Sequence, residues 1–274
     1  LLTGNDSINP IMLIPTQLSS ELKRKYPHLV SQGQAYQLPK NLKLNTLKQL
    51  LKSQLLLVSV NAENKVTYAS NIQIGNVLDD IYTSGLNDAD EITDFGSTLT
   101  EKGTQFKLWA PTAKSVSVLL FNQNKTEYSL KELALVEDSN TGVWHASVDS
   151  SLFEIYYQYK IEIFHPASQR IEKLITTDPY SLSLSSNSKF SQVTSLEHPN
   201  TKPVGWDNQA NPKVKNFEDN IFYELHVGDF SASDNSISPT QVRGKYKAFA
   251  EANSDGIKHL KRLKQAGLNN IHLL

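Results

Sequence analysis

The stretch IYYQYKIEIF, residues 155–164, alternates between two sets of side chains with a period of two. One set is apolar or aromatic throughout and consists of Ile155, Tyr157, Tyr159, Ile161 and Ile163. The other set mixes rings with polar groups and consists of Tyr156, Gln158, Lys160, Glu162 and Phe164. Because successive side chains of a strand point to opposite faces, the stretch predicts a β-strand with the first set in a core.

The residues on both sides of this strand continue the pattern over 96–200. Short strand-like stretches recur at intervals of roughly 8–12 residues, which is typical of an antiparallel β-sandwich. Turn signals such as Asn140-Thr141-Gly142 and His165-Pro166 separate them. We therefore predict a β-sandwich over residues 96–200.

The composition excludes several classes of function. The formal net charge of −1 predicts no attraction to nucleic acid or to anionic lipid. No apolar run approaches the ~18–20 residues of a membrane span, so we expect none. The absence of cysteine excludes disulfides, thiolate metal sites and a cysteine nucleophile. The first residues lack a Met and a basic segment, so no signal peptide is expected in this sequence.

Residues 1–95 form a first section of mixed character. Helical spacing predicts short helices near residues 17–27 and 46–54, and LLLVSVNAENKVTYAS (55–70) predicts two strands around a turn. The Asp- and Gly-rich stretch 75–95 is interpreted as a linker. Its carboxylates do not have the spacing of a calcium-binding EF-hand loop, so no metal site is predicted.

A linker over 201–220 leads to a third section at 221–274. NIFYELHVGDF (220–230) predicts a buried strand, with His226 in the core. A helix capped by Asp255 and a second strand, NNIHLL, follow. This βαβ pattern predicts two parallel strands of a larger sheet. The section is far shorter than the ~250 residues of a (β/α)₈ barrel, so we expect the chain to end inside such a domain.

Four blocks carry a resemblance to a known family. They are FKLWAPTAKSVSVLLF (106–121), TTDPYSLSLSSNSKFSQV (176–193), IFYELHVGDFSASD (221–234) and DGIKHLKRLKQAGLNNIHLL (255–274). In this order they resemble bacterial pullulanases, debranching enzymes of the alpha-amylase superfamily (glycoside hydrolase family 13). IPTQLSSELKRKYPHL (14–29) and GNVLDDIY (75–82) resemble the domain that precedes these blocks in that family.

The resemblance implies a mainly β architecture with some α. Residues 1–95 would be part of an N-terminal accessory domain with its linker, and 96–200 an immunoglobulin-like, family 48 carbohydrate-binding module. Residues 221–274 would be the first βαβ piece of a truncated (β/α)₈ barrel. The whole enzyme would hydrolyse α-1,6-glucosidic linkages of pullulan, starch and glycogen by a retaining, two-carboxylate mechanism. Its parent would be secreted or held at the cell surface, and calcium is compatible with the whole enzyme.

The family's catalytic motifs are not found up to Leu274, so no catalytic residue is assigned and this chain is expected to be inactive alone. Two other interpretations stay open: a free-standing α-glucan-binding module, and the N-terminal part of an isoamylase or glycogen branching enzyme. The partner expected in each case is an α-glucan. An incomplete barrel would also expose Ile221, Leu225, Ile257, Leu260 and Leu263, which predicts self-association.

Sugar recognition commonly places an aromatic ring against the apolar face of a pyranose. Tyr156 is the first candidate, because it lies on the more polar face of its strand beside Lys160. Trp109 is the second, because it lies opposite Phe106 and Leu108 in its own strand. A role for Trp109 in core or domain packing is the alternative.

Overall fold

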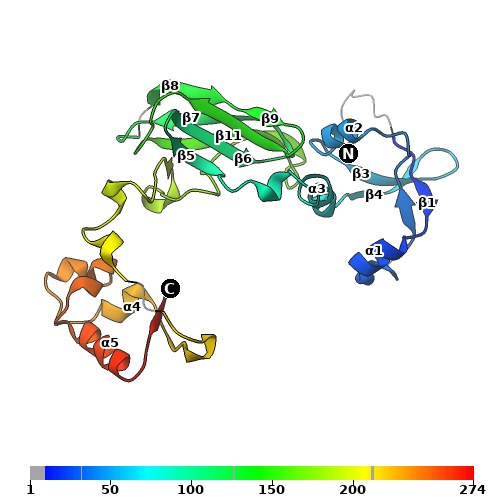
Figure 1. Cartoon of the computed structure of the whole chain (residues 1–274). Coiled ribbons are helices and arrows are strands. Elements are labelled where there is room, and N and C mark those ends of the chain that lie inside the picture. The colour runs from blue at the N-terminus through cyan, green and yellow to red at the C-terminus, as the bar shows by residue number, and fades with distance from the viewer. Residues whose placement is uncertain (1–9, 32, 126, 211–212) are drawn as a thin grey trace. The chain divides into compact units, whose positions relative to one another are not determined.

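The computed structural model describes residues 10–31, 33–125, 127–210 and 213–274 (Figure 1). The chain divides into two compact units, 1–202 and 203–274. The described part is mainly β, with a few short helices and open sheets, as the sequence predicts. None of its helices is long and apolar enough to cross a bilayer.

Two antiparallel sheets form the centre of the first unit (Figure 1). The first sheet has the order β5-β6-β10-β9, with strands Gly96–Thr100, Gly103–Trp109, Val143–Val148 and Val136–Asp138. The second has the order β12-β11-β7-β8, with strands Arg170–Thr176, Tyr156–His165, Ala113–Phe121 and Glu127–Ala134. A short strand, β13 (Ser191–Gln192), also pairs with β11.

The two sheets share one core between their facing sides. Phe106 of β6 meets Tyr157 of β11 edge to face, with ring centroids 5.2 Å apart. Tyr157 and Tyr159 are completely buried, and Ile155 and Ile161 pack against the same cluster. The predicted core face is therefore confirmed from Ile155 to Ile161, whereas Ile163, which follows a register shift after Glu162, lies outside this cluster.

The described part of the segment that precedes the sandwich contains two antiparallel strand pairs, β1–β2 and the hairpin β3–β4, and three α-helices. In chain order these are β1 (Ile14–Thr16), α1 (Ser20–Lys25), β2 (Ala35–Gln37), α2 (Leu44–Leu50), β3 (Leu56–Val60), β4 (Val66–Asn71) and α3 (Gly75–Tyr82). The prediction of a plain linker over 75–95 is wrong at its start, where α3 forms. Tyr82, at the end of α3, is only 1% exposed, so packing holds this helix in place.

Two lysines of α2 and its C-terminal turn join this segment to the sandwich. Lys48 is 8% exposed and Lys52 is 6% exposed. The ammonium of Lys48 donates to the Ser139 carbonyl (2.5 Å) and lies 4.6 Å from the ring centroid of Tyr82. The ammonium of Lys52 lies 2.5 Å from Glu137 Oε2 and 5.3 Å from the ring centroid of Trp144. Burial of the site raises the pKa of Tyr82 to about 12.

The second unit is a small parallel βαβ arrangement. Strands β14 (Phe222–Leu225) and β15 (Asn270–Leu273) pair in parallel, and α4 (Val227–Ser231) and α5 (Asp255–Gln265) lie between them in sequence. The cap of α5 is Ser254, whose Oγ accepts from the Ile257 N–H (3.3 Å). The prediction of Asp255 as the cap is therefore wrong by one residue.

One expectation about burial in this unit is wrong, and a second is right only in part. His226 is exposed, and its Nδ1 accepts from the Asp229 N–H at the start of α4 (3.3 Å). Leu225 and Leu260 are buried, at 7% and 8% exposed, and the ring of Tyr223 in β14 meets that of His259 in α5 edge to face (centroids 5.9 Å apart). Of the five side chains predicted to be exposed, Ile221 is exposed, whereas Ile257 and Leu263 are half-buried. Other exposed apolar side chains of the unit include Phe217, Phe222, Ile271, Leu273 and Leu274.

Candidate carbohydrate-contact site

Tyr156 belongs to a cluster of three aromatic rings on the outer face of the second sheet. The alternation of β11 sends Tyr157 into the core and leaves half-buried Tyr156 on the opposite face. The ring of Tyr156 lies 6.2 Å from that of Phe190, and Phe190 lies 5.0 Å from Phe121 of the neighbouring strand β7. Phe190 reaches this position because β13, which follows it directly, pairs with the start of β11.

Polar groups surround this cluster. The Lys125 ammonium lies 4.9 Å from the ring centroid of Tyr156. The Gln158 amide donates to the Lys189 carbonyl (2.8 Å), which fixes the side chain that follows Tyr156 on the same face. A half-exposed ring flanked by amide and ammonium groups can hold a neutral, polyhydroxylated ligand against its face.

A shallow, polar hollow of about 210 Å³ lies along the same face of the sheet. There the Lys160 ammonium donates to both carboxylate oxygens of Glu132 (2.9 Å each), and the Ser117 hydroxyl donates to Glu132 Oε1 (2.6 Å). The Ser117 hydrogen bond, followed by that of Lys160, lowers the pKa of Glu132. Glu132 is therefore ionised and paired at neutral pH, which suits hydrogen bonding to a ligand and not proton donation.

Trp109 lies on the outer face of the other sheet, where it pairs with Val143. Its ring is half-buried. Its indole Nε1 donates to the Thr141 carbonyl (3.1 Å), so the one hydrogen-bond donor of the side chain is already used. Tyr156 and Trp109 therefore occupy opposite outer faces of the sandwich, and one ligand cannot contact both. The structure therefore does not bring Tyr156 and Trp109 into one site, and it adds Phe121 and Phe190 to the site around Tyr156.

A buried carboxyl group close to the core has a structural role. Asp178 is 4% exposed and accepts from the Tyr157 hydroxyl (2.6 Å) and from the Tyr180 N–H (2.8 Å). Burial raises the pKa of Asp178, and burial also raises the pKa of Tyr157. The sequence predicts no catalytic residue, and within the described ranges no group of three or more His, Asp or Glu could hold a metal.

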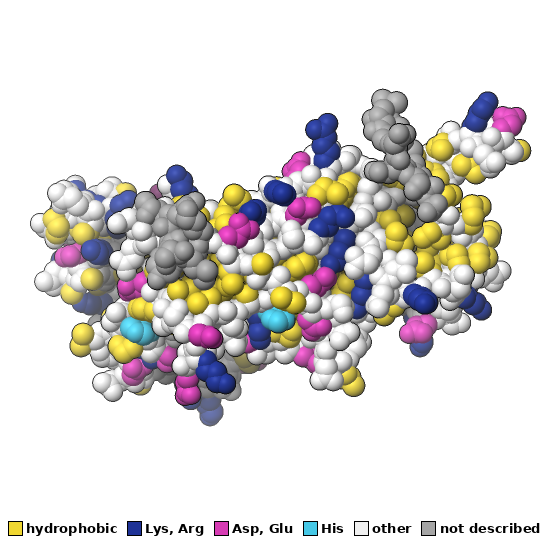
Figure 2. Space-filling model, turned by 90° about the horizontal axis from the view of Figure 1, so that it is seen from above, with side chains coloured by type: hydrophobic (Ala, Val, Ile, Leu, Met, Phe, Trp, Pro, Cys, Tyr) yellow, Lys and Arg dark blue, Asp and Glu magenta, His cyan; other side chains and the backbone are white. Residues whose placement is uncertain are grey.

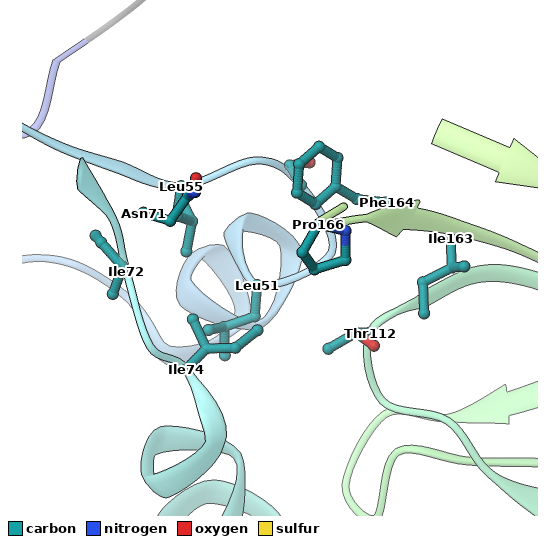
Figure 3. Close-up of a pocket in the computed structure, with 10 residues that line it drawn as sticks. Leu51, Leu55, Asn71, Ile72, Ile74, Thr112, Ile163, Phe164 and Pro166 are labelled. Atoms are coloured by element: carbon teal, nitrogen blue, oxygen red, sulfur yellow. The ribbon is translucent and has the colours of Figure 1, made fainter. Parts of the chain in front are cut away.

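An apolar pocket of about 290 Å³ lies at the end of β11 (Figure 3). Leu51, Leu55, Ile72 and Ile74 come from the segment before the sandwich, and Ile163, Phe164, Pro166 and Thr112 come from the sandwich (Figure 3). Ser53 and Asn71 complete the lining. Sequence reasoning did not single out this pocket, because its walls come from segments about a hundred residues apart.

Two known domain families match the chain. The family described as the Pullulanase N2 domain matches residues 2–80, and that described as carbohydrate-binding module 48 (isoamylase N-terminal domain) matches residues 94–181. The β-sandwich and the segment before it thus match separate families.

Curated relatives extend the match over nearly the whole chain. Pullulanase 1, chloroplastic, of Arabidopsis thaliana is 35% identical over 94% of this chain and 25% of its own length. Pullulanase of Klebsiella pneumoniae is 32% identical over 96% of this chain and 24% of its own length. The chain spans about a quarter of the length of these relatives.

Solved structures show the same likeness in three dimensions. The crystal structure of the maltotriose complex of PulA from Klebsiella pneumoniae matches with a TM-score of 0.87 and 32% identity. The match covers 96% of this chain and 28% of that one.

Proposed function

Because the chain belongs to the pullulanases, as their N-terminal region, we propose that it is the non-catalytic part of an α-glucan debranching enzyme. The whole enzyme would hydrolyse α-1,6-glucosidic linkages of pullulan, starch and glycogen. The order of an N2 domain, a family 48 module and a parallel βαβ unit is the observation that supports this proposal. The match to the Pullulanase N2 domain favours a pullulanase over an isoamylase or branching enzyme. The family 48 module does not distinguish them, because its description also names the isoamylase N-terminal domain.

The proposal assigns residues 221–274 to the beginning of the catalytic barrel. Support comes from the parallel register of Phe222 with Asn270 and from the helix α5 between the two strands. In a (β/α)₈ barrel, catalytic groups lie at the C-terminal ends of several strands, so one pair of strands is insufficient. This chain alone should therefore release no reducing sugar from pullulan, and measurable hydrolysis would contradict the assignment.

Sequencing of the coding region beyond Leu274 tests the barrel directly. Continuation into further strand–helix units that end in Asp and Glu is expected. A stop codon immediately after Leu274 would instead favour the free-standing glucan-binding module. Three further properties stay predictions of the proposed function: self-association of the chain, its export by the parent organism and its metal content.

The glucan contact is assigned to the aromatic cluster around Tyr156. Its support is the group of half-buried rings beside the polar side chains of Gln158 and Lys160 on one face of the sheet. Migration of the chain through a gel containing pullulan should be retarded, and Tyr156→Ala should reduce the retardation. Tyr246→Ala is a matched control, because Tyr246 is 71% exposed in the second unit. Equal retardation of wild type and Tyr156→Ala would reject Tyr156 as a contact.

A further inference from the structure

The hairpin β3–β4 presents one face that leads directly into the apolar pocket. Leu57 pairs with Ser70 and Ser59 with Tyr68, and the Ile72 N–H donates to the Leu55 carbonyl (3.2 Å). Residues directly opposite each other in an antiparallel pair share a face, and the alternation places all three pairs on the same one. We call these six residues, 55, 57, 59, 68, 70 and 72, the hairpin strip.

The hairpin strip and the pocket form one surface. Leu55 and Ile72, at one end of the strip, are also pocket residues, next to Leu51 and opposite Phe164 (Figure 3). At ~3.3 Å per residue, the four steps from Ile72 to Tyr68 extend this surface by ~13 Å. It is therefore long enough to contact several consecutive units of a chain-like ligand.

The strip exposes large apolar side chains to water. Leu57 is 40% exposed, Ile72 43% and Tyr68 61%. Figure 2 shows hydrophobic side chains gathered at the end of the first unit that carries β3 and β4. An isolated two-stranded hairpin is marginally stable in water, so exposed apolar side chains on this one make it a candidate binding surface.

The chemistry of the surface indicates which ligand fits. Neither the strip nor the pocket lining includes a charged residue, whereas the hairpin's charged residues, Glu63 and Lys65, lie at its turn. Tyr68 and Phe164 supply aromatic rings, and Leu57 and Ile72 supply aliphatic surface. The serines of the strip, with Ser53, Thr112 and Asn71 of the pocket, supply uncharged donors and acceptors. Aromatic and aliphatic surface interspersed with uncharged hydrogen-bonding groups, and without any charge, suits a neutral, polyhydroxylated ligand.

We propose that the hairpin strip and its pocket form a second α-glucan contact, separate from the Tyr156 cluster. A neutral glucan chain would lay the apolar faces of its sugar rings on Tyr68 and Leu57, and one end would enter the pocket beside Phe164. The serine hydroxyls of the strip and the Asn71 amide would form hydrogen bonds with the hydroxyl groups of the sugar. This inference rests on the proposed function, since it takes the α-glucan from it.

Nuclear magnetic resonance with labelled Leu and Ile methyl groups and tyrosine rings tests it, with maltohexaose as the probe. Methyl signals of Leu57 and Ile72 should shift on titration. Tyr68→Ala should weaken that response roughly threefold to tenfold, the effect of about one ring contact. Tyr36→Ala is the control, because Tyr36 is 52% exposed in β2 and outside the strip. Tyr156→Ala should leave the Leu57 and Ile72 shifts unchanged.

The outcomes separate this inference from the proposed function. Shifts confined to the surroundings of Tyr156 would overturn the second contact and leave the first intact. Shifts confined to the strip would support the second contact and reject the first. Absence of shifts at both places would overturn both. Shifts of the strip that depend on protein concentration without sugar would show an interface between copies of the chain, which also overturns the inference.

Discussion

Replacement of Lys52 by methionine tests what holds the N-terminal segment to the sandwich. The side chains of Lys52 and Glu137 are 7% and 20% exposed, and their charged atoms lie 2.5 Å apart. Removal of one partner of a buried ion pair costs about 3–5 kcal/mol, because the other charge is left without compensation. Water can reach the partly exposed Glu137, and methionine keeps the packing of the aliphatic stem. We therefore expect a loss of about 2–4 kcal/mol in the free energy of unfolding.

Urea unfolding, followed by circular dichroism and tryptophan fluorescence, measures this loss. Trp144 reports on the junction, because the Lys52 ammonium lies 5.3 Å from its ring centroid. Lys25→Met is the matched control. Lys25 and Asp80 also lie 2.5 Å apart, but their side chains are 51% and 49% exposed. Exposed pairs contribute little to stability and are screened by salt, so the control should unfold almost as the wild type does.

A double-mutant cycle of Lys52→Met with Glu137→Gln isolates the interaction between the two side chains. Equal losses for Lys52→Met and Lys25→Met would refute the reasoning from burial. A coupling energy below about 0.5 kcal/mol would refute it as well. In that case the stem of Lys52, and not its charge, would account for any loss.

Three further predictions concern the sandwich, and four substitutions test them by urea unfolding. Tyr157→Phe removes a 2.6 Å hydrogen bond to a buried carboxyl and should cost about 1.5–3 kcal/mol of the free energy of unfolding. Tyr159→Phe removes a buried hydroxyl without a partner and should be neutral or stabilising. A larger loss for Tyr159→Phe than for Tyr157→Phe would contradict these hydrogen-bond assignments. Because burial raises the pKa of Asp178, its contribution to stability is complete below the ordinary aspartate pKa and declines as pH rises through the raised value. The stability difference between wild type and Asp178→Asn should therefore fall with rising pH. A difference that stays constant with pH would count against a raised pKa of Asp178. Gly103→Ala should cost at least about 2 kcal/mol, since φ is +143° and a Cβ would lie 1.9 Å from the Val148 carbonyl oxygen; near-wild-type stability would exclude that close approach.

The sandwich could be predicted because its signal is local. Alternation alone places Tyr157 and Tyr159 in the core, and both are fully buried. Helix α3 was missed although Val77, Leu78, Ile81 and Tyr82 have helical spacing (75–82). No side chain caps its start, and its aspartates resemble those of a turn. Its stability depends on Tyr82 contacting Lys48, which is a contact between distant residues.

The candidate site could be predicted only in part. The face of β11 identifies Tyr156 as an outward-facing ring, but its neighbour Phe190 depends on the pairing of β13 with β11. The separation of Tyr156 from Trp109 depends on which sheet each strand joins, and strand spacing does not contain that information. The exposure of His226 follows from its position at the start of a short helix, which an apolar strand pattern hides.

The two buried lysines limit how the sandwich can be used as a transferable part. A cut at Gly96 would detach Lys48 and Lys52, leaving the Ser139 carbonyl and the Glu137 carboxylate without their cations and one side of Trp144 bare. A chimera that grafts this module onto another enzyme should therefore carry residues 44–82 along with it. The stable unit for such a graft is therefore expected to be larger than the domain that the family match delimits at residues 94–181.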